Sequence, residues 1–202
     1  MEKCVAPRRI ILILAVMITN CLPAFGGLVR VYRGQFDLRI PADPDASKGW
    51  MQDAVIEVPD HLRIDDLDIS ITISHTKVFD LQIFLESPDG TRILLIMYDP
   101  FNNEYFEGED YNGTIFDDEA DIGIKEGEPP FTGRFRPEES LSAFDGQDAY
   151  GSWRLQVYDA YYADTGRLRA FELSITVPEP LSASFLIFGG SLIRPWRSRR
   201  YS

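Results

Sequence analysis

The chain has 202 residues, of which 45% are hydrophobic, and a formal net charge of −12. This length fits one folded domain with tails. Such acidity argues against nucleic acid and anionic lipid as partners, because those ligands are bound by Lys and Arg that release counterions. The acidity is concentrated in the middle. Apart from seven cations near the two ends and Glu2, the chain holds 13 cations and 31 anions.

Residues 1–26 have the three parts of a secretory signal peptide. Lys3, Arg8 and Arg9 precede an apolar run over 10–18, and a small-residue cleavage site lies at 24–26. The paired arginines and Cys21 also leave open a twin-arginine or a lipoprotein signal, although the flanking residues fit either poorly. Both cysteines lie inside this segment, so the exported protein would have no disulfide and no thiol chemistry.

Residues 27–177 carry the alternating pattern of an antiparallel β-sandwich. From Leu67 to Ser74 every second residue is aliphatic and the others are polar, which predicts a strand with one buried face. Similar segments lie at 28–40, 54–58, 81–85, 114–120, 150–158 and 168–177. With Arg92–Met97 they give about eight strands, joined by Gly, Pro and Asp turns. The apolar run 92–97 predicts a strand buried on both faces.

Between these strands lie two segments without periodicity. Residues 99–113 are rich in aromatic and turn residues and are predicted to form one long loop, with Asn112-Gly113 as a turn before the next strand. Residues 126–137 are predicted to be irregular, and 138–144 to form a helical turn with Leu141 and Phe144 facing the core.

Several blocks in this region resemble the P domain (Homo B domain) that follows the catalytic domain of subtilisin-like proprotein convertases. The resemblance covers about 36–177 and rests on Ser74-His75-Thr76, Asp80-Leu81, Ser87-Pro88, Gly90-Thr91, Phe116 to Ala120, Pro130 to Gly133, Leu141 to Phe144, Gly151 to Leu155 and Asp164 to Leu168. It implies an all-β, jelly-roll-like sandwich of the galactose-binding-domain type. It also implies structural roles for His75, Asp80, Gly90, Trp153 and Gly166. Phe79 and Phe171 depart from the usual Gly and Trp of the family, and we expect them to alter a turn and a packing contact only.

The sequence does not support intrinsic proteolysis. A serine-protease triad needs a histidine base, and the only histidines are His61, in an acidic turn, and His75, at the structural position of the family. No serine-nucleophile motif is present, and the roughly 250 residues of a subtilisin-like catalytic domain are missing. A metal-dependent or carboxylate-based hydrolase is a weaker alternative, because nothing singles out one pair of acids.

Calcium is the metal that this chain fits best, since Ca²⁺ takes oxygen ligands from acidic loops. Asp159, Asp164, Asp117 and Asp118 could converge at one edge of the sandwich, and some members of the resembled family hold structural calcium. The alternative is that Asp164 to Gly166 is an ordinary Asp-Gly turn.

Residues 178–202 resemble a PEP-CTERM sorting signal, which exosortases process in Gram-negative bacteria. Pro178, Glu179 and Pro180 precede an apolar stretch over 181–193 and a cationic cluster that includes Arg197, Arg199 and Arg200. The apolar stretch is shorter than the roughly 20 residues of a stable span, which indicates a transient membrane stop. An unstructured amphiphilic tail is the alternative.

These features predict a secreted, non-catalytic P-domain protein at the cell surface or in the matrix of a Gram-negative-type bacterium. Signal peptidase and exosortase would act on it during export, and a protein or polysaccharide would be its partner. An accessory role in trans for a subtilisin-like serine endopeptidase is the second hypothesis.

Overall fold

A computed structural model describes residues 27–46, 48–97, 108–161 and 164–178. The strands are β1 (Leu28–Ile40), β2 (Gly49–Trp50), β3 (Ala54–Val58), β4 (Asp66–His75), β5 (Leu81–Glu86), β6 (Arg92–Met97), β7 (Tyr111–Phe116), β8 (Phe131–Phe135), β9 (Gly151–Asp159) and β10 (Gly166–Val177). Three short 3₁₀ helices are η1 (Val78–Asp80), η2 (Ile124–Glu126) and η3 (Leu141–Phe144). The predicted all-β class is confirmed.

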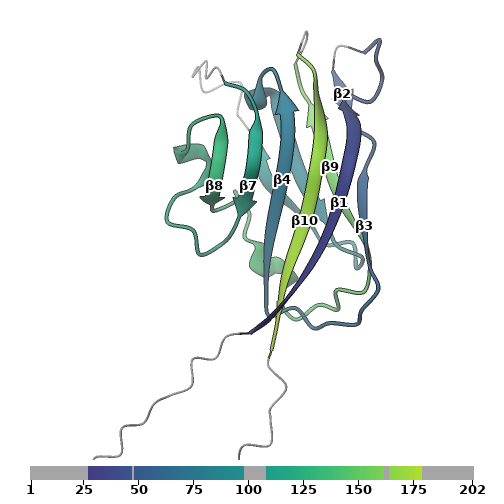
Figure 1. Cartoon of the computed structure of the whole chain (residues 1–202), viewed down its shortest axis with the longest axis vertical. Helices are drawn as coiled ribbons and strands as arrows, with labels where there is room; N and C mark the ends of the chain where they lie inside the picture. The colour runs from purple at the N-terminus through teal and green to yellow at the C-terminus, as the bar shows by residue number, and fades with distance from the viewer. Residues whose placement is uncertain (1–26, 47, 98–107, 162–163, 179–202) are drawn as a thin grey trace, which may run out of the picture.

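The strands form two facing sheets (Figure 1). One sheet has the order β1-β10-β4-β7-β8, and the other has the order β2-β9-β5-β6 with β3 also paired to β9. All pairs are antiparallel except β7 and β8, which run parallel. Strand β8 lies in the segment 126–137 that was predicted to be irregular. Its burial pattern does not alternate, so periodicity could not reveal it.

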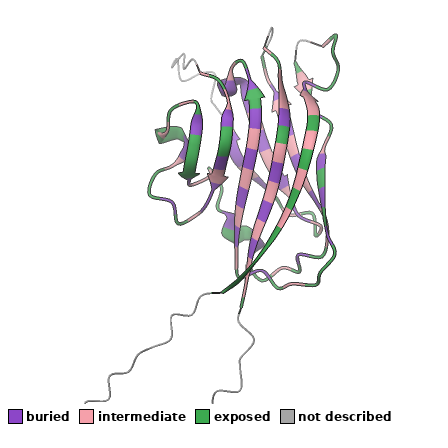
Figure 2. Ribbon diagram, viewed as in Figure 1, coloured by how far each residue is buried: buried purple, intermediate pink, exposed green. Residues whose placement is uncertain are grey.

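The core lies between the two inner faces. In β4 buried and half-buried residues alternate, as predicted, and Figure 2 shows the same alternation along β10. The inward residues of β4 and β10 are nearly inaccessible to solvent, including Ile69, Ile71 and Phe171. Phe171, at a position where the resemblance predicts Trp, therefore packs into the core.

Strand β6 differs from its prediction. It was expected to be buried on both faces, but it is the edge strand of its sheet. Ile93, Leu95 and Ile96 are buried, whereas Leu94 and Met97 are half-buried and Arg92 is exposed. A register shift between Ile83 and Phe84 accompanies the β5–β6 pairing. The free edge is covered by Glu138 and Glu139. Their backbone amides donate to the carbonyls of β6, and their carboxylates accept the amides of Met97 and Leu94, both at 2.6 Å.

The predicted Asn112-Gly113 turn is also wrong, because both residues lie inside β7. Gly113 has φ of +63°, and the register of β7 shifts here against both β4 and β8. The Asn-Gly pair thus forms an irregularity within the strand, where glycine allows the left-handed backbone.

The two ends of the described chain lie together. Leu28 at the start of β1 pairs with Val177 at the end of β10, and the opposite end of the same two strands brings Ile40 beside Gly166. We call these the tail end and the far end of the sandwich. Among the described residues, no helix is long and apolar enough to cross a membrane. The predicted signal peptide and most of the sorting tail lie outside the described residues.

Candidate functional site

His75 and Asp159 join the two sheets at the far end. His75 ends β4, Asp159 ends β9, and both side chains are fully buried. The Nε2 atom of His75 lies 3.3 Å from a carboxylate oxygen of Asp159. If Nε2 carries the proton and donates to Asp159, Nδ1 can accept the backbone N–H of Lys77, which lies 3.1 Å away. The His75 side chain thus contacts both Asp159 and the turn that follows β4.

Two more carboxylates gather beside this pair. We call Asp80, Asp159 and Asp164 the Asp80 cluster. Asp80 ends η1 and is 4% exposed; one of its oxygens is 4.0 Å from the Nζ atom of Lys77, and the other has no hydrogen-bond partner among the described residues. Burial raises the pKa of Asp80 to about 6; Lys77 opposes the rise, and the nearby charges of Asp164 and Asp159 add to it.

The other oxygens of the cluster are already engaged. Asp164 accepts a 2.7 Å hydrogen bond from the hydroxyl of Thr76, and Asp159 accepts the backbone N–H of Tyr161 at 3.2 Å in addition to its contact with His75. One Asp80 oxygen is thus without a hydrogen-bond partner among the described residues, and it lies close enough to Asp164 for the two carboxyl groups to interact. A calcium ion here would draw its remaining ligands from backbone carbonyls and water.

Asp117 and Asp118 do not join this cluster. Asp117 follows β7 and forms an ion pair with Arg134 of β8, which also binds Asp68 of β4 at 2.9 Å. Burial acts to raise the pKa of Asp117, but the hydrogen bonds from Arg134 and from the Glu119 amide outweigh it, so the pKa falls. Asp118 accepts the backbone amides of Leu141 and Ser142 and so fixes the start of η3.

The four predicted calcium ligands therefore separate into two places: Asp159 and Asp164 lie in the Asp80 cluster, and Asp117 and Asp118 lie beside Arg134 and η3. Sequence reasoning assigned Asp80 a structural role and missed its proximity to them. Within the described residues no group of three or more His, Cys, Asp or Glu side chains is arranged to hold a metal. Calcium at the Asp80 cluster stays a prediction.

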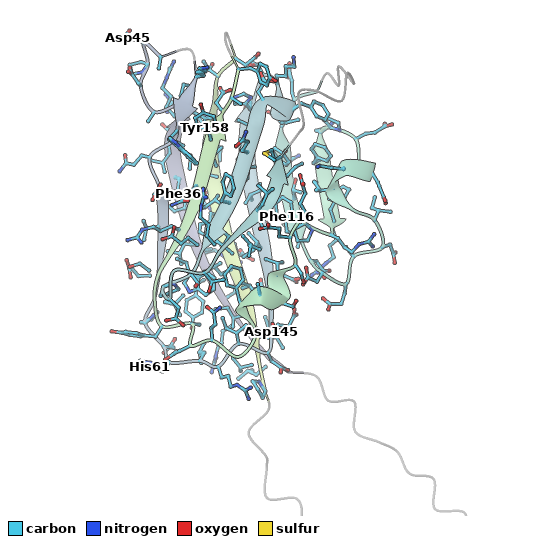
Figure 3. All side chains as sticks on the ribbon, turned by 180° about the vertical axis from the view of Figure 1, so that it is seen from behind. Phe36, Asp45, His61, Phe116, Asp145 and Tyr158 are labelled. Atoms are coloured by element: carbon cyan, nitrogen blue, oxygen red, sulfur yellow. The ribbon has the colours of Figure 1, made fainter. Side chains whose placement is uncertain are left out.

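His61 lies far from this cluster, near the tail end (Figure 3). Its Nδ1 atom is 2.7 Å from a carboxylate oxygen of Asp148, and its ring stacks on Tyr150 at 4.1 Å between centroids. The hydrogen bond from His61 holds the pKa of Asp148 below its ordinary value. Among the described residues, the side chains of the two histidines thus contact carboxylates, an aromatic ring and the Lys77 backbone, and neither is hydrogen-bonded to a hydroxyl.

The sequence profile of the proprotein convertase P-domain matches residues 64–175, which is more than half of the chain. The chain belongs to the P-domain family. The matched range runs from just before β4 into β10, so it includes the Asp80 cluster and the His75–Asp159 contact.

Two solved structures are similar to this P domain. One is the crystal structure of a serine protease of Aeromonas sobria, at 19% identity and a TM-score of 0.44, covering 74% of this chain and 27% of that chain. The other is that protease in complex with its chaperone ORF2, at 19% identity and 0.45, covering 76% and 27%. This chain thus corresponds to about a quarter of those proteins. No curated protein matches it.

The other P-domain motif residues lie in turns or in the core. Gly90 has φ of +83° in the turn after β5, where its amide donates to the Ser87 carbonyl. Trp153 is fully buried; its indole N–H donates to the Ala149 carbonyl at 2.8 Å, and its ring meets Phe144 edge-on. Phe79, which replaces the usual Gly, packs edge-on against Phe131.

Gly166 is required by close packing. A Cβ atom at this position would lie 2.4 Å from the Ser74 carbonyl oxygen and 2.4 Å from the His75 ring. Strand β10 can therefore approach the end of β4 only without a side chain here, and this approach holds the His75 ring against Asp159.

Proposed function

We propose that this protein is an exported, non-catalytic P-domain module that binds or stabilises a partner at the cell surface or in the extracellular matrix. The observation that carries the proposal is the family match over residues 64–175, which falls within the sandwich. The positions of the histidines support it. His75 is buried in a contact between the sheets, and His61 is engaged by Asp148 and Tyr150.

The arrangement of the chain ends supports display on a surface. A signal peptide at 1–26 and a PEP-CTERM tail from 178 would both leave from the tail end, because Leu28 and Val177 are paired. Strand β1 has 13 residues, so the far end lies roughly 40 Å away at about 3.3 Å per residue. A protein attached to the surface at its tail end, whether before or after the tail is removed, would therefore present the Asp80 cluster and its surroundings to the outside.

Export is tested by intact mass measurement of the protein recovered from the cell surface and the culture medium. The proposal predicts a new N-terminus near Gly27 and a C-terminus near Pro178, produced by signal peptidase and exosortase. Recovery of the unprocessed 202-residue chain from the cytoplasm would overturn it.

A subtilisin-like serine endopeptidase acting in trans is the second candidate partner, since the family takes its name from proprotein convertases. The test mixes this protein with such an endopeptidase that lacks its own P domain. A rise in the melting temperature of the protease supports this partner. An unchanged melting temperature removes it and leaves the binding role to other proteins or to polysaccharide.

We also propose that Ca²⁺ binds at the Asp80 cluster through Asp80 and Asp164. The melting temperature of the protein then rises with added Ca²⁺ and returns with chelator. Asp159→Ala with Asp164→Ala abolishes the rise. Asp164→Ala alone is the cleaner variant, because it keeps the His75–Asp159 contact. Asp118→Ala is the matched control and retains the full rise. An unchanged calcium response in Asp164→Ala would rule out the site.

A further inference from the structure

A polar cavity of about 270 Å³ lies at the far end of the sandwich, where β1, β10 and β4 meet. Three arginines line it, namely Arg39, Arg167 and Arg169, together with the residues Ser74, Thr76 and Thr165. Glu109 and Asp110 line it as well. His75 and Gly166 complete the lining, which includes no aliphatic residue and no Phe, Tyr or Trp.

The three cations are unusual in so acidic a protein, and they are unequally compensated. Asp37 forms ion pairs with both Arg167 and Arg169. Arg39 lies directly opposite Arg167 in the β1–β10 pairing, where two like charges destabilise a sheet. Among the described residues Arg39 has no ion pair, and its Nε–H is buried without a hydrogen-bond partner. An anion bound at Arg39 would relieve this repulsion.

The shape and chemistry of the cavity restrict that anion. Arginine binds carboxylates through paired, charge-assisted hydrogen bonds. The acidic side chains of Glu109 and Asp110 disfavour a doubly charged phosphate, but they can accept hydrogen bonds from hydroxyls. A volume of 270 Å³ is at the small end for ligand pockets and suits a single small unit. The lining is dominated by charged and hydroxyl-bearing residues, which favours a hydroxyl-rich ligand over a peptide with apolar side chains.

We propose that this cavity is a binding site for a uronic acid residue of a polysaccharide, with Arg39 holding its carboxylate. The inference deepens the proposed binding role by naming a ligand class, and it rests on that role only for its location outside the cell. The geometry that carries it is the Arg39 environment, which is independent of the P-domain match.

The test is a titration of the purified full-length chain with D-glucuronate, followed by backbone amide NMR shifts and by calorimetry. Glucuronate is expected to shift the amides of Arg39, Thr165 and Gly166, and glucose is expected to leave them unchanged. Arg39→Gln should weaken glucuronate binding at least tenfold. Arg30→Gln is the matched control, since Arg30 is an exposed residue of the same strand outside the cavity, and it should bind as the parent does.

Three results would overturn the proposal. They are equal binding of glucose and glucuronate, equal weakening by Arg39→Gln and Arg30→Gln, and binding of an acetylated peptide carboxylate as tight as that of glucuronate. Arg39→Lys adds a further check, because it keeps the charge but loses the paired geometry and should bind at an intermediate strength. None of these results bears on the non-catalytic role, which is tested separately by proteolysis assays.

Discussion

At the scale of single residues, the far end of the sandwich depends on one close approach. Gly166 brings β10 against the last residues of β4, and the His75 ring meets Asp159 of the other sheet there. A buried polar pair of this kind is costly to break, because each partner would be left without a hydrogen bond. The glycine and the pair therefore act as one structural unit.

Gly166→Ala tests this unit. The added methyl group would contact the Ser74 carbonyl and the His75 ring, so the strands must shift, and we expect the free energy of unfolding to fall by about 1–3 kcal/mol. Urea denaturation measures the change. Gly123→Ala is the control, because the nearest atom to its Cβ is 3.9 Å away and little loss is expected. Equal losses in the two variants would contradict the packing argument.

The raised pKa of Asp80 predicts that the stability of the protein depends on pH. Its pKa is about 6 in the folded protein against an ordinary 3.8, so the folded state binds more protons between these values. The contribution of Asp80 to the free energy of unfolding therefore falls as pH rises from about 4 to 6. Asp80→Asn, which mimics the protonated acid, should lose this fall.

The measurement is the melting temperature across pH 4 to 7 with chelator present. The parent protein should lose stability relative to Asp80→Asn as the pH rises. Asp89→Asn, in the exposed turn after β5, serves as the control and should follow the parent. A parent and an Asp80→Asn variant that keep a constant difference over this range would contradict the pKa assignment.

At the scale of elements, β6 shows how an edge strand is protected. Glu138 and Glu139 occupy its open side with both backbone and carboxylate groups, which prevents a strand of another molecule from pairing there. Glu138 is itself held by Lys125 at 2.8 Å. The segment that follows β8 thus acts as a cover for the second sheet.

Replacing both glutamates by alanine should free the amides of Leu94 and Met97 and promote edge pairing between molecules. Sedimentation velocity is expected to show concentration-dependent dimers that the parent lacks. The control variant carries Asp89→Ala and Glu128→Ala, which remove the same charge at exposed positions. It should sediment as the parent does, without dimers. Dimers in both variants would contradict this explanation, because they would show that the loss of negative charge causes dimerisation without any exposed strand edge.

The elements also show what the sequence could predict. The strict alternation in β4 predicted both a strand and its buried face. The turn residues around Gly90 and the P-domain blocks predicted the class of fold. Strand β8 was missed, because its burial pattern has no alternation. It also pairs in parallel with β7, the strand before it in the chain, so no tight hairpin turn between the two strands marks it. The apolar run in β6 correctly indicated a strand, and Ile93, Leu95 and Ile96 lie in the core. The run could not show that β6 is an edge strand whose backbone is covered by Glu138 and Glu139.

The candidate site was predictable only in part. Asp159 and Asp164 stand near each other in the sequence, and their proximity in space could be inferred. Asp80 joins them through the β5–β9 pairing, and Arg39 meets Arg167 through the β1–β10 pairing. Both contacts depend on which strands pair and in which register. A period of two predicts which face of a strand is buried, but it does not identify the partner strand.

At the scale of the whole molecule, the sandwich separates its attachments from its candidate binding features. The chain enters and leaves at the tail end, whereas the Asp80 cluster and the Arg39 cavity lie at the far end. His61 belongs to the tail end (Figure 3). A molecule attached at its tail end would thus present the Asp80 cluster and the Arg39 cavity outward, without a conformational change.

The most direct test of this account is the hydrolysis of casein and of a peptide panel by the purified chain alone. The account predicts no cleavage above that of a buffer control, in the presence or absence of calcium. Cleavage that co-purifies with the chain and disappears in His61→Ala or Asp148→Ala would contradict it, because it would make the His61–Asp148 pair catalytic.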